Sequence, residues 1–565
     1  MKHFRPHYIL FILLFLWSCS NQNESTYDLV IHNAVIQTLD SENTEYSSIA
    51  IKDGEIVNLQ NDNSLVTESA EKVIDAKGAF VMPGFIEGHG HFSGLGYSLL
   101  NLNFMESKSW DEIIAMVEKK AKTAAPGEWI EGRGWHQEKW IESPGETTNG
   151  YPHHKKLSEA SPDNPVILTH ASGHGVYANA KAMEISGVNI ETPNPEGGRI
   201  VRDEEGQAIG VFEERAMSVI RKAHRQYLDG LSQDELTQTW YRGIELAEEE
   251  CLKKGVTSFH DAGASFVECE RYNGLAVDKK LDVRLWVMIR ENKKALKENA
   301  ARHRVINVGN RFYTCRAIKT AVDGALGSYG AWLLSSYNDK ADFIGQNTTS
   351  IQEIADISEI ANETEMQYCV HAIGDRANRE VLDIFAQFVT PEKNMRWRIE
   401  HAQHLHPSDI PRFGELGVIP AMQGIHCTSD SPFVVKRLGK KRAEEGAYAW
   451  RSLMDSGAII ANGTDVPVED VDPIKSYYAS VTRKRADNKM IFFPTQNMTR
   501  IEALRSYTIN NAYAAFEEGF KGSLEIGKVA DIVILSENLM TCSEDDILNT
   551  KILYTVVDGV VKFKA

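Results

Sequence analysis

Residues 83–92 read "PGFIEGHGHF", a stretch in which two histidines close an apolar run. Side chains alternate between the two faces of a strand, so His89 and His91 are predicted to point to the same side. Neutral imidazole is the commonest metal ligand, and two imidazoles on one face can hold one ion. Taken alone, the stretch is equally compatible with two solvent-facing strand histidines, and the rest of the chain has to separate these interpretations.

The apolar run of this stretch is the first of eight, and helical stretches separate them. Each ends in polar or glycine-rich residues: "FVMPGFIEGHGH", "GVTSFHDAG", "DVRLWVMIR", "RAIKTAVDGALGS", "MQYCVHAIGD", "RWRIEHAQ", "GVIPAMQG" and "AIIANGTD". Continuous apolar strands that alternate with helices indicate a parallel sheet. Eight such units predict an α/β fold of the (β/α)8 TIM-barrel type.

The barrel is predicted to carry two additions. Short strand-like segments with turn signals occupy residues 27–82 and 520–565, and together they predict one composite β-sandwich built from both ends of the chain. The barrel then spans residues 83–519. Because the first and second runs lie too far apart for a simple unit, residues from about 100 to 245 are predicted to form an inserted subdomain after barrel strand 1.

The first residues are predicted to be a targeting segment. Lys2 and Arg5 precede the apolar stretch "YILFILLFLW", which is too short to span a bilayer as a mature helix. The following "LWSCSNQNES" is similar to a bacterial lipoprotein signal, with residues 1–18 removed, Cys19 lipidated and residues 19–26 as a linker. The protein is therefore expected to be exported and anchored in a membrane by lipid. An ordinary secretory signal is the alternative.

The net charge of the chain limits the kinds of partner that we expect it to bind. The 565 residues carry a net charge of −18, which argues against a nucleic-acid binder. The expected partner is a small-molecule substrate, with membrane contact only through the lipid anchor. The sequence leaves the oligomeric state undetermined.

Barrel enzymes place their active sites at the C-terminal ends of the strands. The ends of the runs carry residues that can bind metal, namely His89, His91, Lys319, His371, His401 and Asp465. Any one of the histidines could instead be a core residue bonded to a backbone carbonyl. Because six such residues fall at equivalent positions, they predict one metal site at the barrel mouth.

These motifs, with "GRGWHQEKW", "GHGVYANAKAM" and "GSLEIGKVADIVIL", resemble the amidohydrolase superfamily, in its branch related to N-substituted formamide deformylase (amidohydrolase 3). The resemblance runs from about residue 27 to the end of the chain. It implies the barrel and the composite sandwich that the strand pattern predicts independently.

The resemblance also implies a division of the ligands between two divalent ions. His89, His91 and Asp465 would hold the more buried ion, and His371 with His401 the second. Lys319 matches the lysine that the family carboxylates to bridge both ions. Zinc is the first expectation, with manganese, iron or cobalt as alternatives.

The implied reaction is hydrolysis of a non-peptide C–N bond, in an amide, formamide or cyclic amide, by a hydroxide on the metal. Asp465 would move the proton to the departing nitrogen. His174, Trp135 and His426 are the candidate substrate contacts, and His174 is placed to bind the carbonyl oxygen. Two alternatives stay open: a mononuclear deaminase or isomerase of the same superfamily, and a non-catalytic binding lipoprotein.

Overall fold

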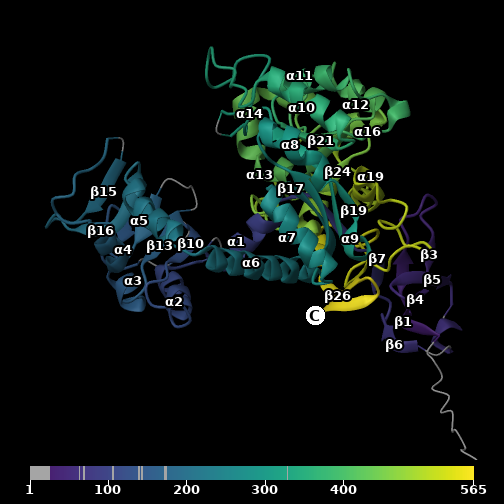
Figure 1. The fold of residues 1–565 in the computed structure, drawn as a ribbon, viewed down its shortest axis with the longest axis horizontal. Coiled ribbons are helices and arrows are strands. Elements are labelled where there is room, and N and C mark those ends of the chain that lie inside the picture. Colours follow the sequence, from purple (N-terminus) through teal and green to yellow (C-terminus); the bar gives the residue numbers. More distant parts are fainter. Residues whose placement is uncertain are drawn as a thin grey trace, which may run out of the picture.

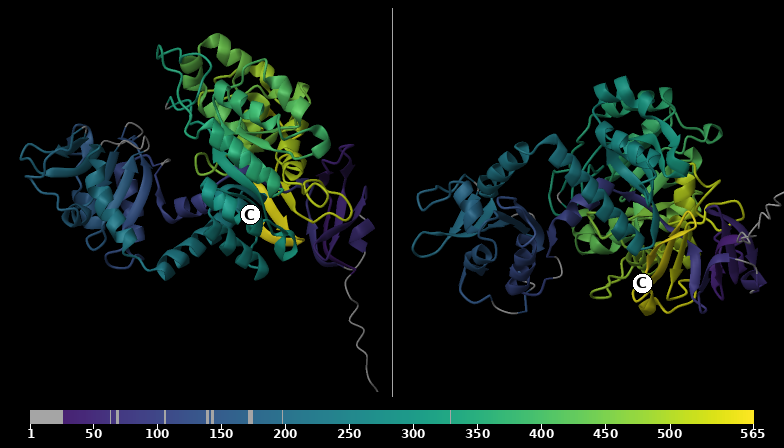
Figure 2. Two further views of the ribbon diagram at one scale, coloured as in Figure 1. Left: turned by 45° about the horizontal axis from the view of Figure 1, so that its top comes forward. Right: turned by 60° about the horizontal axis from the view of Figure 1, so that its bottom comes forward.

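The structure is a computed structural model, and it describes residues 26–62, 64–67, 70–104, 107–137, 140–141, 144–170, 175–196, 198–327 and 329–565. Figure 1 shows three parts: a central barrel, a small lobe where the first and last strands meet, and an inserted lobe that stands apart on the other side. The two further views in Figure 2 keep the same separation. Among the described residues, no helix has the length and apolarity that crossing a membrane requires.

The eight predicted runs form consecutive parallel strands in the described part of the chain, which confirms the barrel. Each strand pairs with the next one along the sequence. In order they are β8 (Phe85–Gly90), β17 (Val256–Ala264), β18 (Arg284–Ile289), β20 (Tyr313–Ala321), β21 (Gln367–Ala372), β22 (Arg398–His401), β23 (Ile419–Gln423) and β24 (Ala461–Gly463).

Hydrogen bonds between the region of the first strand, β8, and the residues that directly follow the last strand, β24, join the two edges of the barrel sheet. The backbone N–H of Asp465 donates to the carbonyl of His89 at 2.7 Å, and the N–H of His91 donates to Val466 at 2.8 Å. Thr464 adds two bonds to the buried Glu87 carboxylate, from its backbone N–H at 2.7 Å and from its hydroxyl at 3.0 Å. This closure places the first and last motifs of the barrel, hundreds of residues apart in sequence, on one rim.

The strands of both chain ends form the composite sandwich, as predicted. Residues of the two ends pair directly, since β7 (Phe80–Pro83) runs antiparallel to β25 (Ile532–Leu535). One sheet holds β5 (Glu55–Gln60), β4 (Ser48–Lys52), β1 (Tyr27–His32) and β6 (Ala70–Asp75). The other holds β27 (Val560–Lys564), β26 (Ile552–Val557), β25, β7, β2 (Val35–Gln37) and β3 (Glu45–Tyr46). Apolar side chains of both sheets, such as Ile31, Ile36 and Ile534, form their common core.

The inserted lobe has a sheet and a core of its own. Its strands are β15 (Gly198–Arg202), β16 (Ala208–Glu214), β14 (Gly175–Ala178), β13 (Val166–His170), β10 (Ile130–Trp135) and β9 (Leu102–Asn103). The lobe joins the barrel through α1 (Phe92–Leu100) and α6 (Gln233–Lys253), which pack on each other (Figure 1). They cross closely at Gly96, where a Cβ would lie 2.5 Å from the carbonyl oxygen of Gly243.

Candidate active site

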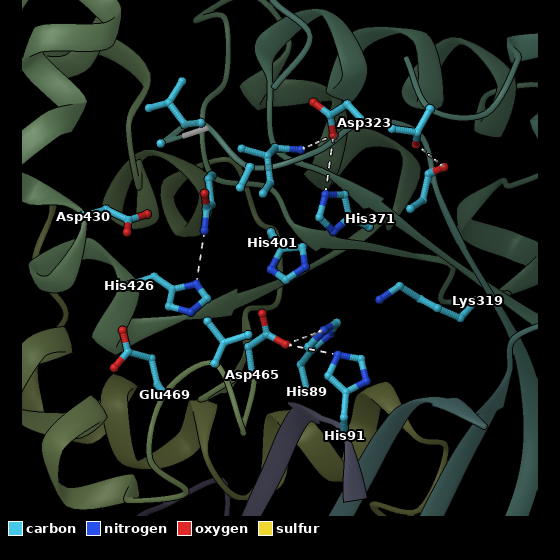
Figure 3. A pocket seen from close by; sticks show the side chains of 18 of the residues that line it. His89, His91, Lys319, Asp323, His371, His401, His426, Asp430, Asp465 and Glu469 are labelled. Carbon is cyan, nitrogen blue, oxygen red and sulfur yellow. Dashed lines mark hydrogen bonds and ion pairs between the residues drawn. The ribbon is translucent and has the colours of Figure 1, made fainter. Parts of the chain in front are cut away.

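A cavity of about 620 Å³ opens at the C-terminal ends of the barrel strands (Figure 3). All the predicted metal ligands line it: His89, His91, Lys319, His371, His401 and Asp465. His426 also lines it, from the short helix α13 (Gly424–Ser429) after β23. The register of the parallel strands therefore brings the dispersed ligand set to one place.

Asp465 lies close to two of the histidines in the ligand set. Its Oδ1 lies 3.3 Å from Nε2 of His91 and 3.6 Å from Nε2 of His89. Burial alone would raise the pKa of Asp465, but the hydrogen bond with His91 and the neighbouring histidines hold it well below its usual range. The carboxylate is therefore anionic at neutral pH.

The histidines are packed ring against ring. The His401 ring centroid lies 4.7 Å from that of His89 and 4.5 Å from that of His371. Burial, and next the charge of Lys319, lower the pKa of His89 to about 4 and that of His371 to about 3. Both rings are therefore neutral, and each keeps one nitrogen lone pair that can bind a metal ion.

The backbone is strained at two of these positions. His401 has φ +74° and Asp465 has φ +59°, in the left-handed region that costs non-glycine residues free energy. Such strain persists where the surrounding structure over-determines it, and it concentrates at functional sites. At Asp465 the closing hydrogen bond to His89 is one such constraint.

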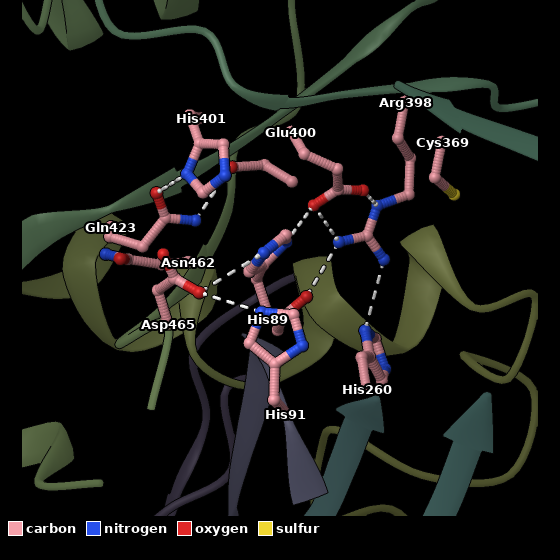
Figure 4. Close-up of polar contacts among 12 residues, drawn as sticks. His89, His91, His260, Cys369, Arg398, Glu400, His401, Gln423, Asn462 and Asp465 are labelled. Carbon is pink, nitrogen blue, oxygen red and sulfur yellow. Dashed lines mark hydrogen bonds and ion pairs between the residues drawn. The ribbon is translucent and has the colours of Figure 1, made fainter. Parts of the chain in front are cut away.

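A buried ion network orients His89 (Figure 4). The Glu400 carboxylate accepts from Nδ1 of His89, so Nε2 carries the lone pair and faces the cavity side. Arg398 pairs with Glu400 at 2.7 Å and donates to the carbonyl of Gly88 at 2.7 Å. Burial by itself raises the pKa of Glu400, but Arg398 and His89 outweigh it and hold that pKa well below its usual range.

The sequence interpretation did not assign Arg398 and Glu400 a role. The available signal was the alternation in "RIEH", where two charged residues occupy same-face positions of a buried apolar strand. Because charged groups inside a barrel need partners, this pattern points to an internal ion pair.

Replacing Glu400 with Gln is expected to destabilise the fold and weaken the metal site together. Arg398 would remain buried without its anion, which costs about 3 kcal/mol of unfolding free energy. Loss of the group that orients His89 would weaken metal binding about 10–100-fold. Denaturant unfolding and metal titration would measure the two effects, with Glu415→Gln on the exposed face of α12 (Ile410–Leu416) as the control. Unchanged metal affinity would contradict the orienting role.

Gln423 orients His401 in the same way. Its side-chain oxygen accepts from Nδ1 of His401 at 2.7 Å, while its amide nitrogen donates to the carbonyl of Ala421 at 3.0 Å. Because both ends of the amide are engaged, its orientation is determined, and Nε2 of His401 is left as the free lone pair.

Asp323 supports the loop beside His371. Its carboxylate accepts hydrogen bonds of 2.8–2.9 Å from the backbone N–H groups of Trp332, Ile373 and Gly374. One carboxylate oxygen, Oδ1, lies 3.7 Å from Nε2 of His371. Burial raises the pKa of Asp323 to about 7, against the lowering effect of these hydrogen bonds. The residue thus joins the end of β20 to the end of β21.

Lys319 is buried on β20, and Figure 3 shows its amine directed toward the histidines. It forms no hydrogen bond or ion pair with another residue that the structure describes. Burial lowers the pKa of its amine. The side chain therefore lies within the ligand set with its nitrogen unengaged by the protein.

The donor atoms fit a metal ion. Ligand atoms of His89, His401 and Asp465 lie within 4.8 Å of one another. Within the described part of the chain, Nε2 of His89 and Nε2 of His371 are buried without a hydrogen-bond partner. Imidazole nitrogen with carboxylate oxygen suits zinc and its first-row neighbours. Within this group His401, which the resemblance assigns to the second ion, lies near His89 and Asp465.

The remaining predicted residues have different outcomes. Trp135 is absent from the cavity lining; the indole is buried in the core of the inserted lobe, where its N–H donates to the carbonyl of Leu168 at 2.9 Å. The prediction that it contacts substrate is corrected accordingly, since an aromatic ring with a satisfied N–H is typical of a core anchor. His174 and Cys19 lie outside the described residues.

Comparison with known proteins agrees with this geometry. The model of the Amidohydrolase family matches residues 72–563. The "Protein LONG AFTER FAR-RED 3" of Arabidopsis thaliana is 30% identical, over 94% of this chain and 91% of that protein. The "N-substituted formamide deformylase" of Arthrobacter pascens is 26% identical, over 95% of this chain and 98% of that one.

A solved structure shares the fold. The crystal structure of an uncharacterized metal-dependent hydrolase from Pyrococcus furiosus superposes with a TM-score of 0.69 and 26% identity, over 91% of this chain and all of that one. With the converging ligand set and the family match over most of the sequence, the comparison establishes that the chain belongs to the amidohydrolase family of metal-dependent hydrolases.

Proposed function

We propose that the protein is a binuclear amidohydrolase that cleaves a non-peptide C–N bond in an amide, formamide or cyclic amide. The observation that carries the proposal is the presence of Lys319 in the same cavity as His89, His91, His371, His401 and Asp465. A lysine with its usual pKa near 10.4 is a cation and would repel two divalent ions. Its carboxylated form would be an anion with two oxygens, which would suit a ligand set for two divalent ions.

Divalent ions held by these residues, with zinc as the first expectation, would supply a water of lowered pKa and would polarise the scissile carbonyl. The side chains of the protein supply the proton transfer and the orientation of the histidine rings. Asp465 accepts the proton of the attacking water and delivers it to the departing nitrogen, which is a poor leaving group as an anion. Glu400 and Gln423 hold the rings of His89 and His401 in the tautomer with a free Nε2.

Two histidines are proposed to contact the substrate. His426 lines the cavity next to His401, with ring centroids 6.3 Å apart and nearly parallel. His174, which lies outside the described residues, remains a predicted contact to the carbonyl oxygen. Apolar lining by Leu326, Phe433 and Val468 suits an apolar substituent on the substrate.

One observation favours a second candidate, a mononuclear deaminase of the same superfamily. His89, His401 and Asp465 by themselves make a three-ligand set for one ion. The two candidates differ in metal count and in product, because a deaminase releases ammonia and an amidohydrolase releases a substituted amine or opens a ring.

Metal removal and restoration tests the proposal. The purified mature protein would be stripped with a chelator and tested against N-substituted formamides, acetamides and cyclic amides. We expect no activity in the stripped protein and recovery that saturates near two equivalents of zinc, manganese, iron or cobalt. Saturation at one equivalent with ammonia release would favour the deaminase, and inactivity under every metal would favour a binding protein.

We also propose that the protein is exported and anchored by a lipid on Cys19. The support is the residue pattern of the N-terminal segment alone. Mass spectrometry of protein from the membrane fraction tests it: a mature chain that begins at a modified Cys19 is expected, and an intact Met1 would contradict it.

A further inference from the structure

Gln403 is part of the "EHAQ" motif, and the proposed mechanism leaves it without a role. Its side chain is 4% exposed, lines the cavity and places its amide nitrogen 3.1 Å from Nδ1 of His426. Its backbone carbonyl accepts from the backbone N–H of Tyr448 at 2.7 Å, which fixes the main chain at this position. Gln403 is thus held on the cavity wall with its amide directed at a second buried side chain.

The amide nitrogen of glutamine can donate but cannot accept a hydrogen bond. Nδ1 of His426 is therefore the acceptor in this contact, and the ring carries its hydrogen on Nε2. His426 is 6% exposed, and its Nε2 has no hydrogen-bond partner among the described residues. The ring thus offers an unpaired N–H donor to the cavity.

This tautomer is the opposite of the one found in the metal ligands. Glu400 and Gln423 accept from Nδ1 of their histidines, which leaves Nε2 of His89 and His401 as lone pairs. Gln403 instead donates to Nδ1. Two glutamines on neighbouring segments of the barrel rim therefore give two stacked imidazoles opposite functions: His401 can bind a cation, and His426 can bind only an acceptor.

The position of His426 is rigid. The helix α13 begins where the N–H of Gly424 donates to Asn462 at 2.9 Å and the N–H of Ile425 donates to Ser476 at 3.1 Å. A Cβ on Gly424 would lie 2.2 Å from the hydroxyl oxygen of Ser480, so the helix sits directly against α17 (Pro473–Thr482). A donor held this firmly is preorganised for a charge that develops during reaction.

We infer that His426 donates the Nε2 hydrogen to the oxygen of the scissile carbonyl as negative charge develops on it, and that Gln403 is the positioning residue that sets this tautomer. The inference rests on the proposed amide hydrolysis. It means that His426 is not a metal ligand. It also gives Gln403 a positioning role, although its neighbour in the motif, His401, is a candidate metal ligand.

Three variants test the inference. Gln403→Glu keeps the size but turns the partner into an acceptor, which moves the proton of His426 to Nδ1. Gln403→Met removes the hydrogen bond and leaves both tautomers accessible. His426→Ala removes the donor, and Gln387→Glu on the exposed surface controls for the added charge.

The first readout needs no substrate. In zinc-loaded protein labelled with 15N-histidine, the signals of His426 are assigned by their loss in His426→Ala. We expect the pattern of the Nε2–H tautomer in the wild type and of a ring protonated at Nδ1 in Gln403→Glu. An Nδ1–H ring in the wild type would overturn the inference whatever the reaction proves to be.

The second readout is catalysis on an N-substituted amide, with metal content confirmed for each variant. Loss of one donor to a developing oxyanion lowers kcat about 100-fold. We expect that loss in His426→Ala and Gln403→Glu, a smaller loss in Gln403→Met, and none in Gln387→Glu. In the His426→Ala background, Gln403→Glu should cause no further loss; an additive loss would mean that Gln403 acts through charge or packing and not through His426. If no amide is turned over, the proposed function fails, while the first readout still decides the tautomer.

Discussion

The Asp465→Asn variant is expected to lose about 10³–10⁴-fold in kcat while its fold changes little, because the residue is proposed to move the proton from the attacking water to the departing nitrogen. In the structure its Oδ1 lies between Nε2 of His89 and Nε2 of His91. An amide in this place keeps the size but neither accepts a proton nor carries the anionic charge. Metal binding should weaken as well, since a carboxylate ligand becomes neutral.

Asn is the right substitution at this position for a backbone reason. Asp465 has φ +59°, and asparagine tolerates the left-handed region better than alanine does. The backbone hydrogen bond to His89 that joins β24 to β8 does not involve the side chain, so the barrel should stay closed. Circular dichroism and the midpoint of thermal unfolding check the fold, and initial rates at saturating metal check kcat. Activity within tenfold of the wild type would remove Asp465 from the proton path.

The Lys319→Ala variant is expected to lower the metal content from about two ions per chain to one or fewer. The loss of the bridge should cost about 4 kcal/mol of transition-state stabilisation, which corresponds to about 1,000-fold in kcat/KM. The physical reason is the position of Lys319 in the ligand set, where its amine is engaged by no other described residue. Elemental mass spectrometry beside initial rates measures both effects, and Lys294→Ala on the exposed face of α8 (Lys293–His303) is the control.

Chemical rescue separates the two forms of this lysine. Alanine leaves space for a small molecule, so acetate or propionate should restore metal and activity if Lys319 carries a carboxylate. A short alkylamine should restore activity if the residue acts as a cation. Two metals per chain in Lys319→Ala without any additive would reject the bridge and favour a site built from the histidines and Asp465 alone.

Much of the barrel follows from the sequence. Each parallel strand buried on both faces must be continuously apolar, and active-site residues gather toward the C-terminal ends of the strands, so eight runs and six candidate ligands could be located along the chain. The prediction that Trp135 contacts substrate was wrong because large aromatic rings occur both in pocket walls and in hydrophobic cores. Its environment depends on the other strands of the inserted lobe, such as β13 with Leu168.

The sequence by itself determined which residues can bind metal and on which strand end each one stands, because these depend on residue type and on the two-residue period of a strand. Only the tertiary structure decided what each histidine can do. The tautomer of His89, His401 and His426 is set by Glu400, Gln423 and Gln403, which lie on other strands or just after one. Whether such a partner donates or accepts is a property of contact across the barrel, and no local pattern in the chain encodes it.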